Sequence, residues 1–318
     1  MILVIGEALI DLIENRYQPG SFNAIVGGAN ANVAIALARR GTAHSFAGRV
    51  STDAFGQQII KKLEDNGVDL RHTVRTDDPT TLAVVSINEK GSPTYSFYVN
   101  GTADWGWTPD ELPLTDAKAI QFGCLTMAME PGNRVIEAWA RVQADDKTIS
   151  HDVNLRPALG FEVASEQVRV ERINEFSHLI KASDEDLSWL YPGESYHDVA
   201  LRWSAGKLVL ITRGADGTDV YRDGTHLFNV PSRKINVVDT VGAGDTFCAN
   251  LLGQLLEGDH LGSGDGSSPA EKLLSFDAEV LRGYVHVAGV AASITCERPG
   301  CEPPTRDDLA AVLIRSVI

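Results

Sequence analysis

The stretch Asp239-Thr240-Val241-Gly242-Ala243-Gly244-Asp245-Thr246-Phe247 carries the most information about how this chain folds. It ends a strand-like run over 235–239 and leads into an apolar segment that continues at least to Leu256. The pattern predicts a strand that ends at Asp239, a loop of small residues and then a helix. Glycines at a helix start leave backbone N–H groups accessible, and these groups attract anions together with the helix dipole.

Asp245 lies in the first turn of this expected helix. The helix dipole favours the ionised side chain, so we expect a carboxylate at neutral pH. Beside an anion site, a carboxylate can accept a proton from an incoming hydroxyl, and phosphoryl transfer needs little else beyond positioning and charge neutralisation. A tight turn whose aspartate only stabilises the helix start explains the same residues equally well. The motif alone leaves both interpretations open.

Two other phosphate-binding signatures are missing from the sequence. The chain has no Gly-x-x-x-x-Gly-Lys-Ser/Thr segment, which excludes a P-loop enzyme. Gly242-x-Gly244 is followed three residues later by Phe247 rather than glycine, which excludes the dinucleotide-binding fingerprint.

Composition and charge limit the class of protein and its partners. The 318 residues are 43% hydrophobic and 22% charged, which is typical of a globular chain with a substantial core. The net charge of −15 argues against nucleic acid and anionic membranes as partners. Four cysteines are too few for a disulfide scaffold, and no apolar run reaches the roughly 20 residues of a membrane span. The N-terminus lacks the features of a signal peptide, so we expect a cytoplasmic protein.

The remaining pattern predicts a parallel sheet covered by helices. Short apolar strands alternate with helical stretches, and this alternation is typical of α/β proteins. The expected strands cover 1–5, 44–50, 119–122, 148–153, 178–181 and 207–211, and the clearest helices cover 29–40 and 54–66. Residues 80–98 differ, because two β-rich runs flank a polar turn and indicate a hairpin.

A second motif pairs with the first. It runs Gly27-Gly28-Ala29-Asn30-Ala31-Asn32-Val33-Ala34 and continues at Gly48-Arg49-Val50-Ser51-Thr52-Asp53-Ala54-Phe55-Gly56. With 239–247, these segments resemble the two signatures of the ribokinase-like, or PfkB, carbohydrate kinases. The resemblance implies one α/β domain over 1–318, a three-layer α/β/α unit with a mostly parallel central sheet. It also implies a small β-sheet lid formed by about 12–26 and 80–105.

The same resemblance implies an ATP-dependent sugar kinase with Asp245 as the catalytic base. The anion hole would be formed by Gly242, Ala243 and Gly244. Sugar contacts would come from Asp11, Gly27, Gly28, Asn32, Tyr98, Asn100, Asn154 and Arg156. The nucleotide would contact Ser183, Asp186, Thr212, Gly214, Gly217 and Gly289. Magnesium is expected near Asp186 through water, and a monovalent cation such as potassium near Asp239 and Thr240.

Local pattern also bears on two of the segments that contribute these residues. Strand alternation places Asp152, Asn154 and Arg156 on one face. Ser183-Asp184-Glu185-Asp186 stands where the family has Asn-x-x-Glu, and a helix capping box fits these residues too. The same residues can cap a helix and also organise magnesium and phosphate.

The substrate is the least defined part of the interpretation. Among the family, the chain is most similar to fructokinases, although many of these carry arginine where Val99 stands. A 2-keto-3-deoxygluconate kinase, which would use Arg156 for the substrate carboxylate, and a ribokinase are the alternatives. A catalytically silent sugar-binding regulator is the alternative from another class. Trp105 and Trp107 fit either a stacking wall for a sugar or packing against the sheet. Apolar lid strands make a homodimer through the lid an expectation.

Overall fold

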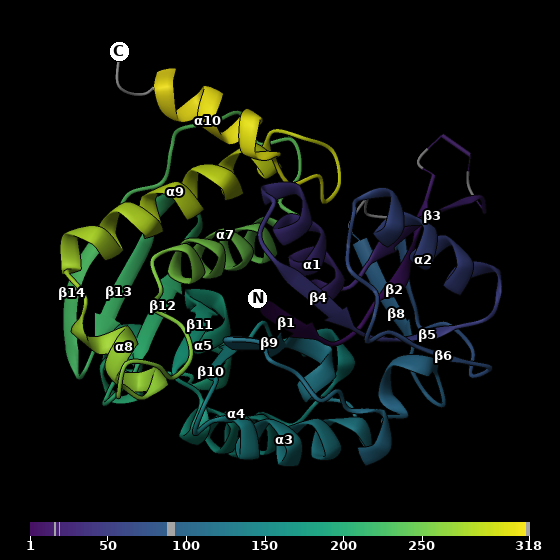
Figure 1. Cartoon of the computed structure of the whole chain (residues 1–318). Helices are drawn as coiled ribbons and strands as arrows, with labels where there is room; N and C mark the ends of the chain where they lie inside the picture. Colours follow the sequence, from purple (N-terminus) through teal and green to yellow (C-terminus); the bar gives the residue numbers. More distant parts are fainter. Residues whose placement is uncertain (16, 19, 88–92, 316–318) are drawn as a thin grey trace.

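A mostly parallel sheet forms the centre of the molecule (Figure 1). The computed structural model describes residues 1–15, 17–18, 20–87 and 93–315. Within these residues, the sheet has eight strands in the order β14 (Thr225–Val230), β13 (Thr218–Arg222), β12 (Leu208–Thr212), β11 (Leu179–Ser183), β10 (Thr148–Asp152), β9 (Ala119–Gly123), β1 (Ile2–Ile5) and β4 (His44–Ala47). Neighbouring strands pair in parallel from β12 to β4, and the pairs β12–β13 and β13–β14 are antiparallel. The expected α/β class is confirmed.

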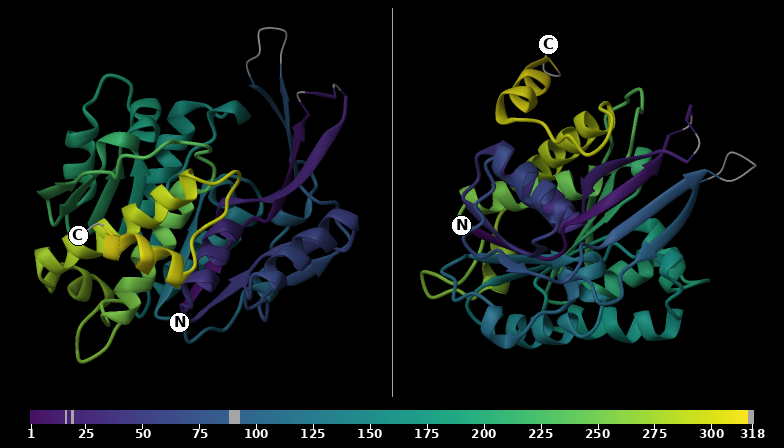
Figure 2. Two further views of the ribbon diagram at one scale, coloured as in Figure 1. Left: turned by 90° about the horizontal axis from the view of Figure 1, so that it is seen from above. Right: turned by 90° about the vertical axis from the view of Figure 1, so that its right-hand side faces the viewer.

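Helices cover both faces of this sheet, as the views from above and from the side show (Figure 2). One face carries α1 (Ala29–Arg40), α7 (Ala243–Glu257) and α9 (Ala278–Cys296), and the other carries α3 (Gly132–Gln143), α4 (Val163–Phe176), α5 (Asp184–Leu190) and α6 (Tyr196–Trp203). Strand alternation explains the two layers, because Leu179 packs with the first group of helices and Ile180 with the second.

The remaining helical elements lie around these layers. They are α2 (Ala54–Asp65), α8 (Pro269–Ser275), α10 (Arg306–Arg315) and short 3-10 turns at Ala103–Trp105, Pro109–Glu111, Cys124–Met127, Pro157–Leu159 and Gly214–Asp216. The expected helix 29–40 has the bounds of α1 and ends at Gly41 in the left-handed conformation. None of the helices among the described residues has the length and apolar character needed to cross a membrane.

A second sheet projects from one end of the molecule and forms the lid (Figure 2). Its strand order is β3 (Phe22–Gly27), β2 (Leu9–Glu14), β7 (Leu82–Ile87) and β8 (Pro93–Tyr98). The expected hairpin over 80–98 is the antiparallel pair β7–β8, although its turn at 88–92 lies outside the described residues. The expected single strand over 44–50 is instead divided at Gly48, because β5 (Arg49–Ser51) leaves the main sheet and pairs with β6 (Val74–Thr76).

One buried carboxylate joins the chain segments that lead into the lid. Asp104 Oδ1 accepts a hydrogen bond from the backbone N–H of Ala8, just before β2, at 2.9 Å. Its Oδ2 accepts one from the hydroxyl of Thr81, just before β7, at 2.5 Å. The Thr81 hydroxyl also lies 2.6 Å from that of Thr102, which follows β8. Asp104 thus fixes three connections of the lid at a single point.

Replacing Asp104 with alanine is expected to lower the free energy of unfolding by about 1–3 kcal/mol, because the Ala8 N–H and the Thr81 hydroxyl would lose a buried acceptor. Urea denaturation followed by circular dichroism measures this change. Asp110→Ala, at an exposed position in a nearby 3-10 turn, is the matched control and should change the value by less than about 0.5 kcal/mol. Equal losses in the two variants would contradict the assigned role of Asp104.

Candidate active site

The loop before α7 brings the N-terminus of this helix to the ends of the parallel strands. Gly242 is the N-cap residue and has φ of 75°. A Cβ atom there would lie 2.0 Å from Cys301 Sγ, so both the backbone conformation and the available space require glycine. The first N–H groups of a helix have no partner within the helix, although that of Ala243 donates to Thr240 O at 3.3 Å. The helix start can therefore bind an anion.

The expected strand ending at Asp239 was wrong. The segment 231–240 contains no strand, because the N–H groups of Val238 and Asp239 donate to the carbonyl oxygen of Cys296 at 2.8 and 3.2 Å. Asp239 accepts hydrogen bonds from the N–H groups of Val241 and Gly300. These bonds tie the glycine loop to the C-terminal end of α9 and to the segment that follows it.

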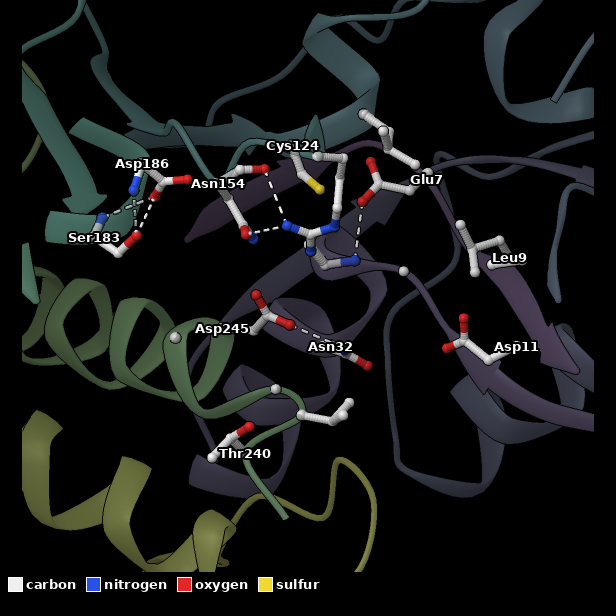
Figure 3. Close-up of a pocket in the computed structure, with 18 of the residues that line it drawn as sticks. Glu7, Leu9, Asp11, Asn32, Cys124, Asn154, Ser183, Asp186, Thr240 and Asp245 are labelled. Atoms are coloured by element: carbon white, nitrogen blue, oxygen red, sulfur yellow. Dashed lines mark hydrogen bonds between the residues drawn. The ribbon is translucent and has the colours of Figure 1, made fainter. Parts of the chain in front are cut away.

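Asp245 lies in the first turn of α7 and is held by a residue from α1. Its Oδ2 accepts a hydrogen bond from Asn32 Nδ2 at 2.8 Å, and its side chain is directed into a cavity (Figure 3). Burial raises the pKa of Asp245 to about 7, although Asn32, Lys181 and Arg156 all act to lower it. The helix dipole alone leads us to expect full ionisation at neutral pH, whereas a pKa near 7 leaves the protonated and the ionised forms both populated.

This cavity, here called the acceptor cavity, has a volume of about 380 Å³. Asp11 lies at one end, Ser183 and Asp186 at the other, and Asp245 between them (Figure 3). Burial raises the pKa of Asp11 to about 6. The lining residues are Glu7, Leu9, Asp11, Gly28, Ala29, Asn32, Ala83, Phe97, Cys124, Leu125, Asn154, Arg156, Lys181, Ser183, Asp186, Thr212, Thr240, Val241, Gly242, Gly244 and Asp245.

Arg156 supplies a cation to the acceptor cavity. Its Nη1 donates to Asn154 Oδ1 at 2.6 Å and to the backbone oxygen atoms of Asn154 and Leu155. No carboxylate among the described residues forms an ion pair with it. The expected shared face of Asp152, Asn154 and Arg156 was wrong, because β10 ends at Asp152 and Asn154 has φ of 36°. Asp152 does not line the cavity.

Ser183 and Asp186 form the capping box of α5. The Asp186 N–H donates to Ser183 Oγ at 3.0 Å, and Asp186 Oδ2 accepts from the N–H and the hydroxyl of Ser183. Asp186 Oδ1 accepts from the N–H of Leu155 at 2.8 Å. No group of three or more His, Cys, Asp and Glu side chains suited to a metal occurs in the described part of the chain. The single carboxylate of Asp186 fits a magnesium ion that keeps most of its water and phosphate ligands and contacts the protein through water.

A second cavity of about 470 Å³ adjoins the first, and Thr212, Thr240 and Gly244 line both. It is more apolar, with α9 on one side and the loop after β12 on the other. Its lining residues are Thr212, Gly214, Ala215, Gly217, Thr218, Ser232, Arg233, Lys234, Ile235, Val237, Thr240, Ala243, Gly244, Phe247, Gly289, Ala292, Ser293 and Cys296. A shared wall at the first turn of α7 suits two ligands that meet there.

Most residues selected from the sequence line one of the two cavities, but some do not. Tyr98 is 61% exposed, and alternation along β8 places Phe97 rather than Tyr98 in the acceptor cavity. Asn100 is exposed in a turn outside the cavity. Gly27 and Asp239 are also absent from both linings, although a Cβ at Gly27 would lie 2.2 Å from Asp11 Oδ2.

The aromatic and apolar residues near the lid pack inside the protein. Trp105 and Trp107 are buried in apolar clusters, so the packing interpretation holds for both rather than the stacking wall. Val99 is buried with Leu9 and Trp105 in one of these clusters.

Several cavity residues escaped the sequence analysis, among them Glu7, Phe97, Cys124 and Lys181. Glu7 lies two residues beyond the end of β1, and the end of a buried parallel strand is a recognisable place for a functional side chain. Lys181 interrupts an apolar strand with a charge, which is also a detectable signal. Cys124 has no such signal, because its position depends on a left-handed backbone with φ of 52°.

Comparisons with known proteins agree on one family. The model of the "pfkB family carbohydrate kinase" matches residues 1–307. A fructokinase of Rhizobium leguminosarum bv. trifolii is 37% identical over 261 residues, which cover 80% of this chain and 79% of that protein. The crystal structure of a fructokinase with bound ATP from Xylella fastidiosa has a TM-score of 0.87 and 27% identity, covering 100% of this chain and 99% of that one.

A third relative was solved with its ligands. The double-mutant fructokinase of Vibrio cholerae O395, in a form with bound fructose, ADP and potassium ion, has a TM-score of 0.79 and 25% identity. The match covers 98% of this chain and 97% of that one. The structural match therefore includes both the main sheet and the lid of this chain.

The Asp245 carboxyl group is expected to titrate with a midpoint near pH 7 because it is buried. The ¹³Cγ chemical shift of labelled aspartate measures this midpoint, and Asp245→Asn identifies the resonance. Asn32→Ala should move the midpoint to higher pH, because the hydrogen bond from Asn32 favours the ionised form. A midpoint near 4 in the wild-type protein would contradict the dominance of burial at Asp245.

Proposed function

Since the chain belongs to the pfkB family of carbohydrate kinases and is thus an ATP-dependent sugar kinase, we propose that it phosphorylates fructose with Asp245 as the catalytic base. One observation carries the assignment of the base. Asp245 stands at the first turn of α7, where the acceptor cavity and the second cavity meet. A proton acceptor and a helix start that can bind an anion thus both lie where the two cavities meet.

The proposed reaction needs one proton acceptor and one anion site. Asp245, oriented by Asn32, takes the proton of the acceptor hydroxyl. The hydroxyl oxygen forms a bond to the γ-phosphorus of ATP, and the bond from that phosphorus to the β–γ bridging oxygen breaks. The electron pair leaves with ADP. Backbone N–H groups at Gly242 to Gly244 would hold the charge of the group in transit.

The second cavity is the proposed nucleotide site. Gly214 and Gly217 on one side and Gly289 on α9 on the other leave room for a flat base, and Thr212 and Gly244 reach toward the acceptor cavity. Magnesium would neutralise the phosphate charge, with Asp186 as its nearest carboxylate through water. A monovalent cation near Asp239 and Thr240 remains a proposal, supported by the potassium ion in the relative from Vibrio cholerae.

Fructose is proposed because fructokinases recur among the similar proteins. Asp11 and Asn32 offer the carboxylate and amide groups that bind hydroxyls, and Phe97 and Leu9 offer an apolar wall. A sugar acid such as 2-keto-3-deoxygluconate is the second candidate. Arg156 favours it, because this guanidinium lies in the cavity without a carboxylate partner among the described residues.

Three further assignments complete the proposal. The chain forms one domain over 1–318, with a lid that includes about 12–26 and 80–105. Exposed Ile13, Phe22 and Ile25 on the lid support a homodimer through this sheet. The cytoplasm is the proposed location, in keeping with the four free cysteines.

Asp245→Asn is expected to reduce phosphate transfer from Mg·ATP by at least about 100-fold, because the amide cannot accept the proton. Sugar binding, measured by calorimetry, should remain within a few-fold of the wild type. A coupled assay of ADP release over fructose, ribose, 2-keto-3-deoxygluconate and nucleosides gives the turnover. A wild-type protein that binds a sugar yet transfers phosphate to none of these acceptors would instead be a binding regulator.

Arg156→Gln separates the two candidate substrates. If the acceptor is a sugar acid, kcat/KM for 2-keto-3-deoxygluconate should fall by about 10- to 100-fold more than that for fructose, because a charge-assisted hydrogen bond is lost. If the acceptor is fructose, the wild type prefers fructose and the variant changes both values alike. A preference of the wild type for the acid would overturn the fructose assignment.

A further inference from the structure

A buried ion pair lies directly beneath the first turn of α7. Lys181 on β11 and Asp152 on β10 are register partners in the parallel sheet. Lys181 Nζ lies 2.9 Å from both carboxylate oxygens of Asp152, and the two side chains are only 6% and 5% exposed. Removing such a pair from water is costly, and a neutral apolar pair would fill the same space at least as well. Its presence at this position therefore calls for an explanation.

The two members of the ion pair lie differently with respect to the acceptor cavity. Lys181 lines the cavity, whereas Asp152 does not. The ammonium is also close to the helix start, because a Cβ atom built on Gly244 would lie 3.2 Å from Lys181 Nζ. The absence of a side chain at Gly244 thus leaves the path between the ammonium and the cavity open. The positive end of the pair faces the place where the two cavities meet.

The ammonium is charged and has donor capacity to spare. Burial is the largest single influence on Lys181 and lowers its pKa, but the charge and hydrogen bonds of Asp152 and the other acidic groups nearby together outweigh it, and the pKa lies above the ordinary value for lysine. An ammonium group has three N–H donors. Two are directed to Asp152, and no other hydrogen-bond acceptor for Lys181 occurs among the described residues. One donor thus remains for a ligand.

We propose that Lys181, held in place by Asp152, is a further catalytic residue that donates a hydrogen bond to an oxygen of the transferring phosphoryl group. The inference rests on the proposed function, because it needs ATP in the second cavity and an acceptor near Asp245. Lys181 approaches from the sheet, and the N–H groups of the α7 start approach from the helix. The migrating group then carries its negative charge between two positive sources. Asp152 is a positioning residue, since its carboxylate binds Lys181 and does not line the acceptor cavity.

A purely structural role is the competing explanation. The pair packs in a polar row beneath α7 in which Cys248 Sγ lies 3.3 Å from Gln121 Oε1 and Ser150 Oγ lies 2.5 Å from the same oxygen. A structural pair would affect stability and leave the discrimination between nucleotides unchanged. The proposed contact instead concerns the γ-phosphate, which ATP has and ADP lacks. Nucleotide affinities therefore separate the two roles.

The test variant is the double substitution K181M/D152L, which removes both charges and leaves neither partner buried alone. Calorimetry gives the affinity for a non-hydrolysable ATP analogue and for ADP, each with magnesium. The analogue should bind about 10-fold more weakly than to the wild type, and ADP should change less than about 2-fold, because the lost hydrogen bond joins charged groups. Should this variant not fold, K181Q/D152N provides an uncharged polar pair for the same measurement.

The matched control is E166L/R169M. This second buried ion pair, in α4, has both side chains 7% exposed and lies outside both cavities. It should leave the ratio of the two affinities unchanged. In the Lys181 variant, kcat/KM should also fall by about 100-fold. An unchanged affinity ratio in a folded double variant would overturn the role of Lys181, whereas a wild-type protein that transfers no phosphate would overturn the proposed function instead.

Discussion

The burial of the Asp245 carboxylate beside a helix start determines the rest of the site. Burial in this position opposes the charge, and the N-terminus of α7 together with nearby cations favours it. The balance keeps the pKa near neutrality, where a carboxylate can both receive a proton and release it. Gly242 makes the arrangement possible, because only glycine fits its backbone conformation against Cys301.

The main sheet and the lid supply the two sides of this site. The parallel strands end together at one edge, so Ser183 and Thr212 from β11 and β12 reach the same region as the start of α7. The lid contributes Asp11 and Phe97 from the opposite side. Asp104 fixes the entry points of the lid strands. Apolar side chains at the base of the lid also pack against the rest of the molecule, since Ile10 belongs to the main core and Leu9 packs with Leu125.

Sequence patterns identified the elements whose period and end signals are local. The α1 helix, with Gly41 at its end, and the alternation of strands and helices follow from side-chain spacing alone. Asp245, Asn32 and Asp11 were found through motifs, and the structure brings them to one cavity. The predictions that were wrong concern features that depend on contacts between distant segments of the chain. Tyr98 was chosen instead of Phe97 because the face of β8 depends on register with β7, and the irregular segment before Gly242 depends on distant bonds to α9.

A crystal structure with ADP, an aluminium fluoride mimic of the planar phosphoryl group and an acceptor sugar would show whether transfer takes place between the start of α7 and Asp245. We expect the mimic to lie at the first turn of α7, within hydrogen-bond distance of the N–H groups at Gly242 to Gly244. We also expect an Asp245 oxygen about 2.6–3.2 Å from the acceptor hydroxyl. A mimic bound away from α7, or a sugar whose hydroxyl groups do not reach Asp245, would contradict this proposal.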